Sequence, residues 1–242
     1  MKAVILCGGL GSRLSEYTKN CPKPLLKVNQ LSIIEWQIIS LKKVGVTEIL
    51  INLHYLAEQV IEYLKDGNHL GVKIKYIFQE KLNGTGGGVK IFQNELINEE
   101  FFFVVYGDIL TNENLFRLVN FHIKNKADCS IYVHERKDSN SLFFINEDDG
   151  MVLDFIERPS CVEKKIFIKK HKIYKYFSNS AIYLMSPKVL NYIPKNIFVD
   201  IPKQILIKII NDHKLYALPI EKQRYAIDSV EKYKEARINF KG

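Results

Sequence analysis

The first half of the chain alternates two patterns of apolar and polar positions. Short apolar runs predict buried strands, and stretches with an apolar residue every three or four positions predict amphipathic helices. The predicted strands are Ala3–Cys7, Glu48–Leu53, Val72–Phe78 and Phe101–Val105, and the predicted helices are Ser32–Val44, Ala57–Leu64 and a stretch around Val89–Leu96. Strands separated by helices of this length indicate βαβ units, and therefore a mostly parallel sheet covered by helices on both faces.

The pattern changes at about residue 128, where short strands follow one another with turns between them. These predicted strands are Cys129–Val133, Leu142–Ile145, Val152–Ile156, Ala181–Met185 and Leu215–Leu218, with helices over Ile201–Ile210 and from about Ser229. No linker rich in Pro, Gly or Ser separates the two parts. We therefore expect an α/β fold with a Rossmann-like sheet and a more antiparallel part, in one domain spanning residues 1–242.

Three loops of the first half each follow a predicted strand. They are Gly8–Arg13, the glycine-rich stretch Gln79–Gly88, and Gly107-Asp108. Ligands of open parallel sheets bind at the carboxyl ends of the strands. The three loops are therefore expected to converge on one cleft.

The composition narrows the function classes without choosing one. A net charge of +8 in 242 residues suits nucleic acid, a membrane surface, a small polyanionic substrate, or simply a solvated surface. The apolar runs are much shorter than the ~20 residues that span a bilayer, and no secretory signal is recognisable, so a cytoplasmic location is expected. The four cysteines are scattered, which favours free thiols over a zinc site or disulfides.

The strongest local motif lies at the end of the first predicted strand. Leu6-Cys7-Gly8-Gly9-Leu10-Gly11-Ser12-Arg13-Leu14 is followed downstream by Pro22-Lys23-Pro24. Glycines after a strand let backbone amides approach a phosphate, and Arg13 and Lys23 add a guanidinium fork and a compact positive charge. A tight turn is the simpler reading of the glycines alone, but the basic residues favour phosphate binding.

This motif resembles the signature of the sugar-1-phosphate nucleotidyltransferases, of the mannose- or heptose-1-phosphate guanylyltransferase and glucose-1-phosphate thymidylyltransferase kind. The resemblance continues in order along nearly the whole chain, at Gly84-Thr85-Gly86-Gly87, Tyr106-Gly107-Asp108, Glu157-Arg158-Pro159, Asn179-Ser180-Ala181-Ile182-Tyr183 and Ile227-Asp228. It implies an enzyme of nucleotide-sugar and polysaccharide biosynthesis that joins NMP from an NTP to a sugar 1-phosphate and releases pyrophosphate. GTP with a mannose- or heptose-type 1-phosphate is the pair it favours.

The resemblance also assigns the site residues. It implies nucleotide binding by about residues 1–127, through Leu6, Gly8, Gly9, Gly11, Ser12, Gln79, Gly84, Thr85, Gly86 and Gly107. It implies catalytic roles for Arg13, Lys23 and Asp108, and Mg²⁺ binding by Asp108 and Asp228. It implies acceptor binding by about residues 128–242, through Glu157, Arg158 and Asn179. Transfer of this type needs positioning and charge neutralisation more than covalent help from side chains.

Each assignment has a simpler structural rival. Asp108 suits a turn, Asp228 the start of the last helix, Glu157 a surface ion pair, and Asn179 a turn. The chain also departs from the family pattern, which usually has Lys where Arg158 stands and a different turn after Asp228. A basic segment, Lys164–Lys172, is inserted before Asn179; it suits an edge strand kept soluble by lysines, or alternatively a cover over the acceptor site.

Other functions stay open at this level. A CTP-dependent cytidylyltransferase acting on a sugar or alcohol phosphate such as choline phosphate shares some features, and a catalytically inactive nucleotide-sugar-binding regulator would share the fold. Retention of both aspartates with Arg13 and Lys23 disfavours the regulator. Neither nucleic-acid nor membrane partners are expected, because no accompanying motif supports them. Association into a homo-oligomer is left open.

Overall fold

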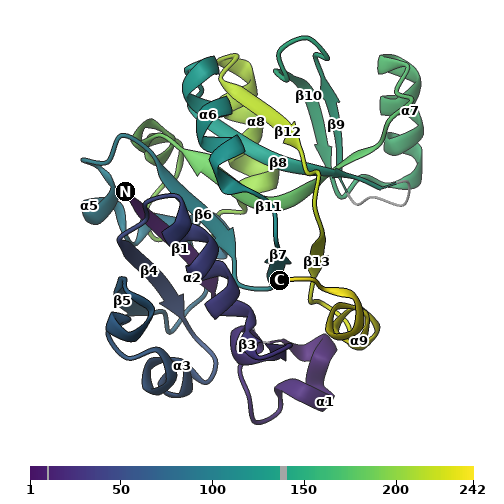
Figure 1. Ribbon diagram of the computed structural model, residues 1–242. Coiled ribbons are helices and arrows are strands. Elements are labelled where there is room, and N and C mark those ends of the chain that lie inside the picture. The colour runs from purple at the N-terminus through teal and green to yellow at the C-terminus, as the bar shows by residue number, and fades with distance from the viewer. Residues whose placement is uncertain (10, 137–140) are drawn as a thin grey trace.

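One nine-stranded sheet runs through the computed structural model, which describes residues 1–9, 11–136 and 141–242 (Figure 1). Along its main path the strand order is β10-β9-β11-β6-β1-β4-β5, with β8 paired to β11 and β12 to β8. The strands are β1 (Lys2–Cys7), β4 (Glu48–Leu53), β5 (Lys73–Phe78), β6 (Phe102–Tyr106), β8 (Cys129–Glu135), β9 (Ser141–Ile145), β10 (Val152–Glu157), β11 (Phe177–Met185) and β12 (Leu215–Pro219). Leu10 of the glycine motif lies outside the described residues.

The pairing changes direction along the sheet. β6, β1, β4 and β5 are parallel, whereas β11 is antiparallel to β6, β8 and β9. The predicted α/β fold, with a mostly parallel sheet and a more antiparallel second part, is therefore confirmed. Because β6, β1, β4 and β5 are parallel, their carboxyl ends lie at the same edge of the sheet. A ligand site is expected at that edge.

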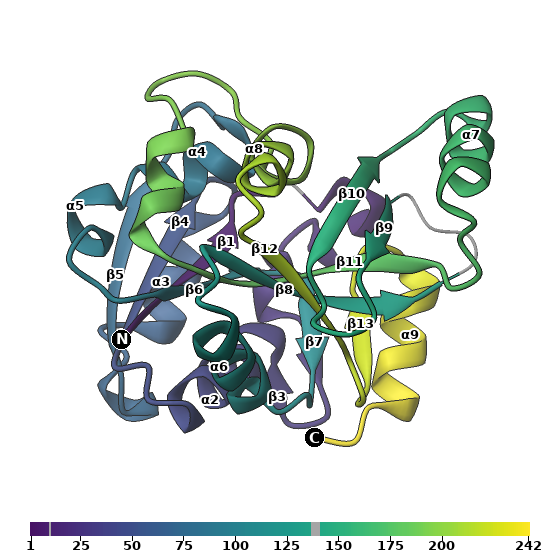
Figure 2. The same cartoon turned by 90° about the horizontal axis from the view of Figure 1, so that it is seen from above.

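Helices cover both faces of the sheet. Figure 2 shows α4 (Gly84–Lys90) and α8 (Leu206–Asn211) on one side, with α2 (Ile33–Lys43) and α6 (Leu115–Asn125) on the other. The remaining helices are α1 (Ser15–Thr18), α3 (Ala57–Leu64), α5 (Gln93–Leu96), α7 (Cys161–His171) and α9 (Val230–Asn239). Among the residues that the structure describes, no helix is long and apolar enough to cross a membrane.

Two small sheets complete the fold. β2 (Lys27–Val28) pairs with β3 (Leu31–Ser32), and β7 (Ile109–Thr111) pairs with β13 (Arg224–Ala226). The second pair matters for the site, because it joins the segment after β6 to the segment before α9. The hydrogen bond from the Ile227 amide to the Asp108 carbonyl, at 2.8 Å, continues this pairing.

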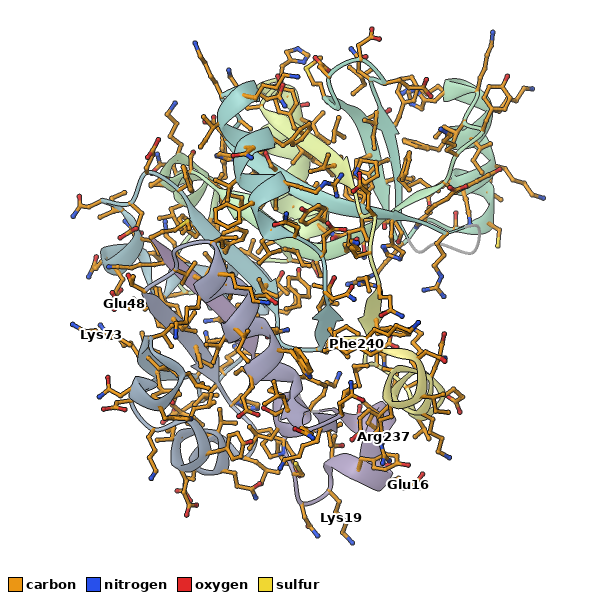
Figure 3. All side chains as sticks on the ribbon, viewed as in Figure 1. Glu16, Lys19, Glu48, Lys73, Arg237 and Phe240 are labelled. Carbon is orange, nitrogen blue, oxygen red and sulfur yellow. The ribbon has the colours of Figure 1, made fainter. Side chains whose placement is uncertain are left out.

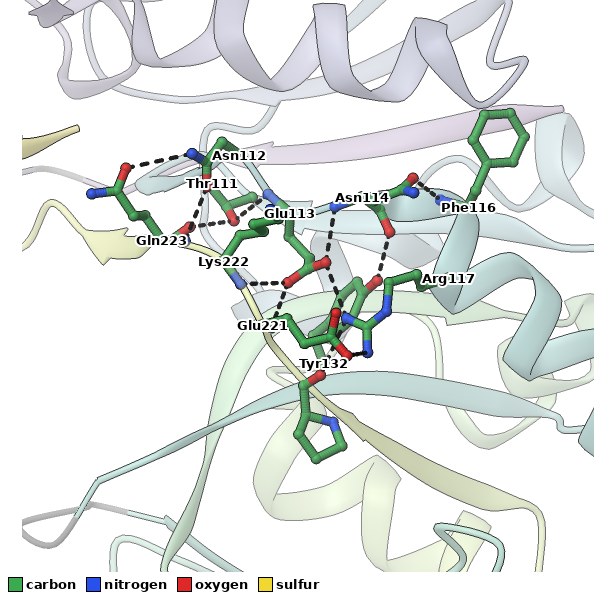
Figure 4. A network of polar contacts seen from close by, with 11 residues as sticks. Thr111, Asn112, Glu113, Asn114, Phe116, Arg117, Tyr132, Glu221, Lys222 and Gln223 are labelled. Carbon is green, nitrogen blue, oxygen red and sulfur yellow. Dashed lines mark hydrogen bonds and ion pairs between the residues drawn. The ribbon is translucent and has the colours of Figure 1, made fainter. Parts of the chain in front are cut away.

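A buried carboxylate holds the segment that leads into β13 (Figure 4). Glu113 accepts hydrogen bonds from the amides of Glu221 and Lys222 at 2.7 and 2.9 Å and from the Arg117 guanidinium at 3.0 Å. Burial opposes the charge of Glu113, but these donors outweigh it and lower the pKa of the carboxyl. The chain before β13 is therefore anchored to the loop between β7 and α6.

The glycine-rich stretch Gly84–Gly88 is not the loop that the sequence predicted; it forms the first turns of α4. Gly84 has a φ of +74°, and a Cβ there would overlap the Val199 carbonyl. The amide of Gly86 donates to the same carbonyl at 2.8 Å. Because glycine has no side chain, the segment around Val199 can pack directly against the backbone of the helix. Helix propensity read from the sequence does not reveal this contact.

The edge strand predicted for Lys164–Lys172 is also wrong, because this segment lies in α7 and just beyond it. Ser160 and Glu163 form a capping box that starts the helix. One side of α7 packs on β9 and β10, where His171 stacks on Phe144 at 4.3 Å between ring centres. The capping box was readable in the sequence, but the dense lysines obscured the helical period. In Figure 2, α7 lies at the outer edge of the molecule.

Candidate active site

A cavity of about 280 Å³ opens at the carboxyl ends of β1 and β6 and at the start of α4. Its walls combine glycines, apolar side chains and a few polar groups. They are Leu6, Cys7, Gly8, Gly9, Lys23, Pro24, Asn52, Leu82, Gly84, Thr85, Tyr106, Gly107, Asp108 and Phe198. The three predicted loops therefore meet at one place, although five of their predicted site residues do not line the cavity itself: Gly11, Ser12, Arg13, Gln79 and Gly86.

Glycine is required where the two strand ends touch. A Cβ on Gly107 would lie 2.8 Å from the Cys7 sulfur and 2.9 Å from the Leu6 carbonyl oxygen. The Gly107 amide donates to that carbonyl at 2.9 Å, which extends the pairing of β1 and β6 to the cavity wall. Farther along, Gly11 has a φ of +67° and turns the chain into a short 3₁₀-helix (Ser12–Leu14). Gly107 therefore forms part of the cavity wall, and Gly11 shapes the turn that follows Gly8 and Gly9.

Asn52 is a site residue that the sequence analysis missed. It is buried near the end of β4; its side-chain oxygen accepts from the Cys7 amide at 3.0 Å, and its nitrogen donates to the Gln79 side chain at 2.9 Å. Gln79, predicted to bind the nucleotide, is therefore held behind the cavity wall by Asn52. A polar residue inside the apolar run Glu48–Leu53 was the available signal, because a buried amide needs partners.

The segments that carry the two aspartates are far apart in the sequence but lie side by side in the fold. Asp108 follows β6 and Asp228 follows β13, and the Ile227–Asp108 backbone bond joins their segments. Lys23 lies 3.3 Å from Asp108. Arg13 and Lys232 lie 3.6 and 2.6 Å from Asp228.

The alternative interpretation, in which Asp228 caps the last helix, does not hold, because the next residue is the cap. Ser229 is the N-cap of α9, and its side chain accepts from the Lys232 amide. The Asp228 carboxylate is instead directed toward Arg13 and Lys232. The predicted catalytic cations Arg13 and Lys23 are therefore each paired with one of the predicted metal ligands.

A second group of predicted residues lies beside the cavity, at the end of β10. One Glu157 carboxylate oxygen is buried without a hydrogen-bond partner among the described residues. The Arg158 guanidinium contacts the other Glu157 oxygen at 3.4 Å and Asp200 at 3.5 Å. Burial raises the pKa of Glu157 to about 7, although Arg158 opposes the shift.

Asn179 sits in an irregular part of β11. Its side-chain oxygen accepts from the Ala181 amide at 2.7 Å, and its nitrogen donates to the Tyr183 hydroxyl at 2.8 Å. The pairing of β11 with β8 shifts register here, and Ala181 has a φ of +59°. Asn179 therefore supports a bulge, which is a common device for redirecting side chains beside a site.

The raised pKa of Glu157 predicts a pH-dependent cost in stability. The unfolded state loses this proton near pH 4.3, whereas the folded state keeps it to about pH 7, so the free energy of unfolding falls as pH rises between these values. Glu157→Gln removes this titration. As pH rises from 5 to 8, the free energy of unfolding of the variant should therefore increase by roughly 1–3 kcal/mol relative to that of the native protein. Urea unfolding of both proteins across that range measures the gain. A difference that is independent of pH would contradict this account of Glu157.

Comparison with known proteins identifies the family of the chain. A family model described as "Nucleotidyl transferase" matches residues 2–224. The chain belongs to the nucleotidyl transferase family.

Two named relatives are similar in sequence to the chain. The chain is 34% identical over 223 residues to the probable mannose-1-phosphate guanylyltransferase 2 of Oryza sativa subsp. japonica, covering 90% of this chain and 58% of the relative. It is 32% identical over 192 residues to the D-glycero-alpha-D-manno-heptose 1-phosphate guanylyltransferase of Campylobacter jejuni, covering 79% and 78%. The chain thus spans little more than half the length of the plant relative.

A solved structure shares the fold of this nucleotidyl transferase chain. A Bacillus anthracis protein described provisionally as a glucose-1-phosphate thymidylyltransferase superposes with a TM-score of 0.84 at 22% identity, covering 100% of this chain and 98% of that one. At this identity the likeness shows the fold alone.

Proposed function

We propose that this chain transfers the NMP part of a nucleoside triphosphate to a sugar 1-phosphate, and that GTP and a mannose- or heptose-type 1-phosphate are its substrates. The observation that carries the proposal is the ion pair of Lys23 and Asp108 in the cavity wall, with the segment of Asp228 hydrogen-bonded to Asp108, in a nucleotidyl transferase chain. The guanylyltransferase names of the two relatives support the choice of base and sugar.

The chemistry of the donor set fits Mg²⁺. Asp108 and Asp228 offer hard carboxylate oxygens from two backbone segments that are hydrogen-bonded to each other. Among the described residues no cluster of three or more His, Cys, Asp or Glu side chains forms a metal cage. Mg²⁺ commonly uses one or two carboxylates, and takes its other ligands from water and substrate phosphates. Bound there, it would neutralise charge on the reacting phosphates.

The chain's own groups account for the rest of the proposed reaction. The amides around Gly8 and Gly9 and the side chain of Arg13 bind the triphosphate, and Lys23 stabilises charge that builds on the α-phosphate as pyrophosphate leaves. The nucleophile is an oxygen of the sugar phosphate, which attacks the α-phosphorus in line. A phosphate monoester is already largely ionised near pH 7, so no side chain needs to take up a proton.

The two halves of the chain divide the substrates between them in this proposal. About residues 1–127 bind the nucleotide, and about residues 128–242 bind the acceptor. Glu157 and Asn179 bind the sugar hydroxyls. Arg158 bridges Glu157 and Asp200, and so sets the orientation of both carboxylates.

Pyrophosphate release in the presence of Mg²⁺ tests the proposal. ATP, GTP, CTP, UTP and dTTP are each combined with mannose, heptose and glucose 1-phosphates and with choline phosphate. Release with GTP and a mannose-type acceptor supports the full proposal, and release with another sugar pair corrects the base or the sugar. Release with CTP and choline phosphate assigns the chain to the cytidylyltransferase alternative. Nucleotide binding without any release favours the inactive regulator.

A further inference from the structure

One cation that interacts electrostatically with Asp108 and Asp228 forms no ion pair within the part of the chain that the structure describes. Arg224 is the first residue of β13, and a terminal nitrogen of its guanidinium donates to the Ser180 carbonyl at a long 3.4 Å. Its Nε is sealed from solvent and has no hydrogen-bond partner among the described residues. A buried donor without a partner is costly, and a buried unpaired charge is costlier still. Burial accordingly lowers the pKa of Arg224 to about 10, although Asp108 and Asp228 oppose the shift.

The nearby carboxylates are occupied by other cations. Lys23 is paired with Asp108, and both Arg13 and Lys232 are paired with Asp228. Two carboxylates therefore face three paired cations before Arg224 is counted. The surplus of positive charge around Arg224 is what a bound dianion would neutralise.

The place of Arg224 in the fold identifies that dianion. Arg224 interacts electrostatically with Asp108, with Asp228 and with Tyr183. The Tyr183 hydroxyl in turn accepts a hydrogen bond from Asn179. The Ser180 carbonyl that it contacts belongs to the β11 bulge. Arg224 thus neighbours both the proposed metal ligands and the strand that carries Asn179, a proposed sugar-binding residue. In the proposed reaction the phosphate of the sugar 1-phosphate links these two groups.

Arg158, another arginine of the acceptor half, is differently placed. It is engaged by Glu157 and Asp200 and its side chain is 56% exposed. Its charge is therefore balanced within the protein, whereas that of Arg224 is not. The sequence directed attention to position 158, and gave no reason to single out Arg224.

We propose that Arg224 binds the phosphate dianion of the acceptor and holds it beside the proposed Mg²⁺ site at Asp108 and Asp228. The proposal rests on the proposed function and adds the residue that recognises the acceptor phosphate. The planar guanidinium presents two neighbouring donors, Nε and a terminal nitrogen, which match two oxygens of one phosphate. The third oxygen is left to attack the α-phosphorus. β7 and the Glu113 contacts fix the strand that carries Arg224.

Steady-state kinetics of Arg224→Gln and Arg224→Lys test the assignment. The Gln variant is expected to raise the KM for the sugar 1-phosphate about 10–100-fold, as for loss of charge-assisted hydrogen bonds. The KM for the triphosphate should change by less than about threefold, since the nucleotide contacts are elsewhere. The Lys variant keeps the charge but not the fork, and should fall between the two. Arg237→Gln removes a matched charge from the surface of α9, where Arg237 packs over Tyr233, and should leave both KM values unchanged (Figure 3).

Two results would overturn the proposal. One is a Gln variant whose acceptor KM equals that of the native protein; the other is one in which both KM values rise equally. If Arg224→Gln does not fold, by circular dichroism and thermal unfolding, an unchanged acceptor KM in Arg224→Lys overturns it instead.

A binding measurement separates this proposal from the proposed function. Inorganic phosphate is titrated calorimetrically into the native protein and the Arg224 variants, without triphosphate or acceptor. Weaker phosphate binding by the variants supports an anion site at Arg224 even if the native protein releases no pyrophosphate from any substrate pair. Equal binding by native and variant proteins overturns the site, whatever the catalytic assay gives.

Discussion

The Asp108→Asn variant is expected to lose about 10²–10³-fold in turnover, the range seen when one preorganised electrostatic group is removed from an active site. Asparagine keeps the size of the side chain but not the charge that holds a cation. Asp108 lies at the cavity wall, 3.3 Å from Lys23, so the substitution changes both the proposed metal site and this ion pair. Pyrophosphate release at saturating substrates, measured against Mg²⁺ concentration, gives the loss in turnover and any weakening of Mg²⁺ dependence.

Asp148→Asn is the matched control for this variant. Asp148 is exposed in the turn between β9 and β10, and the substitution makes the same chemical change outside the site. It should leave turnover and Mg²⁺ dependence as they are. If Asp108→Asn retained more than about half of the native turnover, Asp108 would have no essential role in metal binding or in transfer.

The Lys23→Met variant is expected to lower turnover about 10²-fold or more while changing the affinity for the triphosphate much less. Methionine keeps much of the side-chain length and removes the ammonium group. The Lys23 side chain is only 14% exposed and lines the cavity 3.3 Å from Asp108, so its charge acts in a poorly screened place. Single-turnover rates give the chemical step, and nucleotide titration of the same protein gives the binding constant.

Lys19→Met is the control for Lys23. Lys19 lies nearby in the sequence, just after α1, and points away from the body of the protein at the bottom of Figure 3. It should have native kinetics. Should Lys23→Met bind the triphosphate far more weakly but transfer it at the native rate once bound, Lys23 would be a nucleotide-binding residue and not a catalytic one.

The sequence predicted those parts of the fold in which local pattern and burial agree. The apolar runs of β1, β4 and β6 predicted buried parallel strands, and the Ser32–Glu35 capping box starts α2 within one residue of the predicted position. Failures occurred where tertiary contacts overrode local preference. Gly84–Gly88 is a poor helix former, and is helical because another segment packs closely on its glycines.

The site was predictable only in outline. The order of strands and loops placed Gly8, Gly107 and Asp108 together, since each follows a parallel strand. The approach of Asp228 depends on the pairing of β7 with β13, two three-residue strands that carry no periodic signal. Arg224 and Asn52 were missed for a related reason. Arg224 stands out because its buried Nε has no hydrogen-bond partner among the described residues, and Asn52 because it bonds to both Cys7 and Gln79. No motif marks either residue in the sequence.

The most direct test of the central claim follows the oxygen atoms of the acceptor phosphate. The native protein is incubated with Mg²⁺, GTP and mannose 1-phosphate whose phosphate carries ¹⁸O, or with the pair that the substrate panel selects, and both products are analysed by mass spectrometry. Attack by the acceptor phosphate on the α-phosphorus predicts that all the ¹⁸O is retained in the nucleotide sugar and that pyrophosphate is unlabelled. Labelled pyrophosphate, or pyrophosphate formed without a nucleotide sugar, would contradict the proposed transfer.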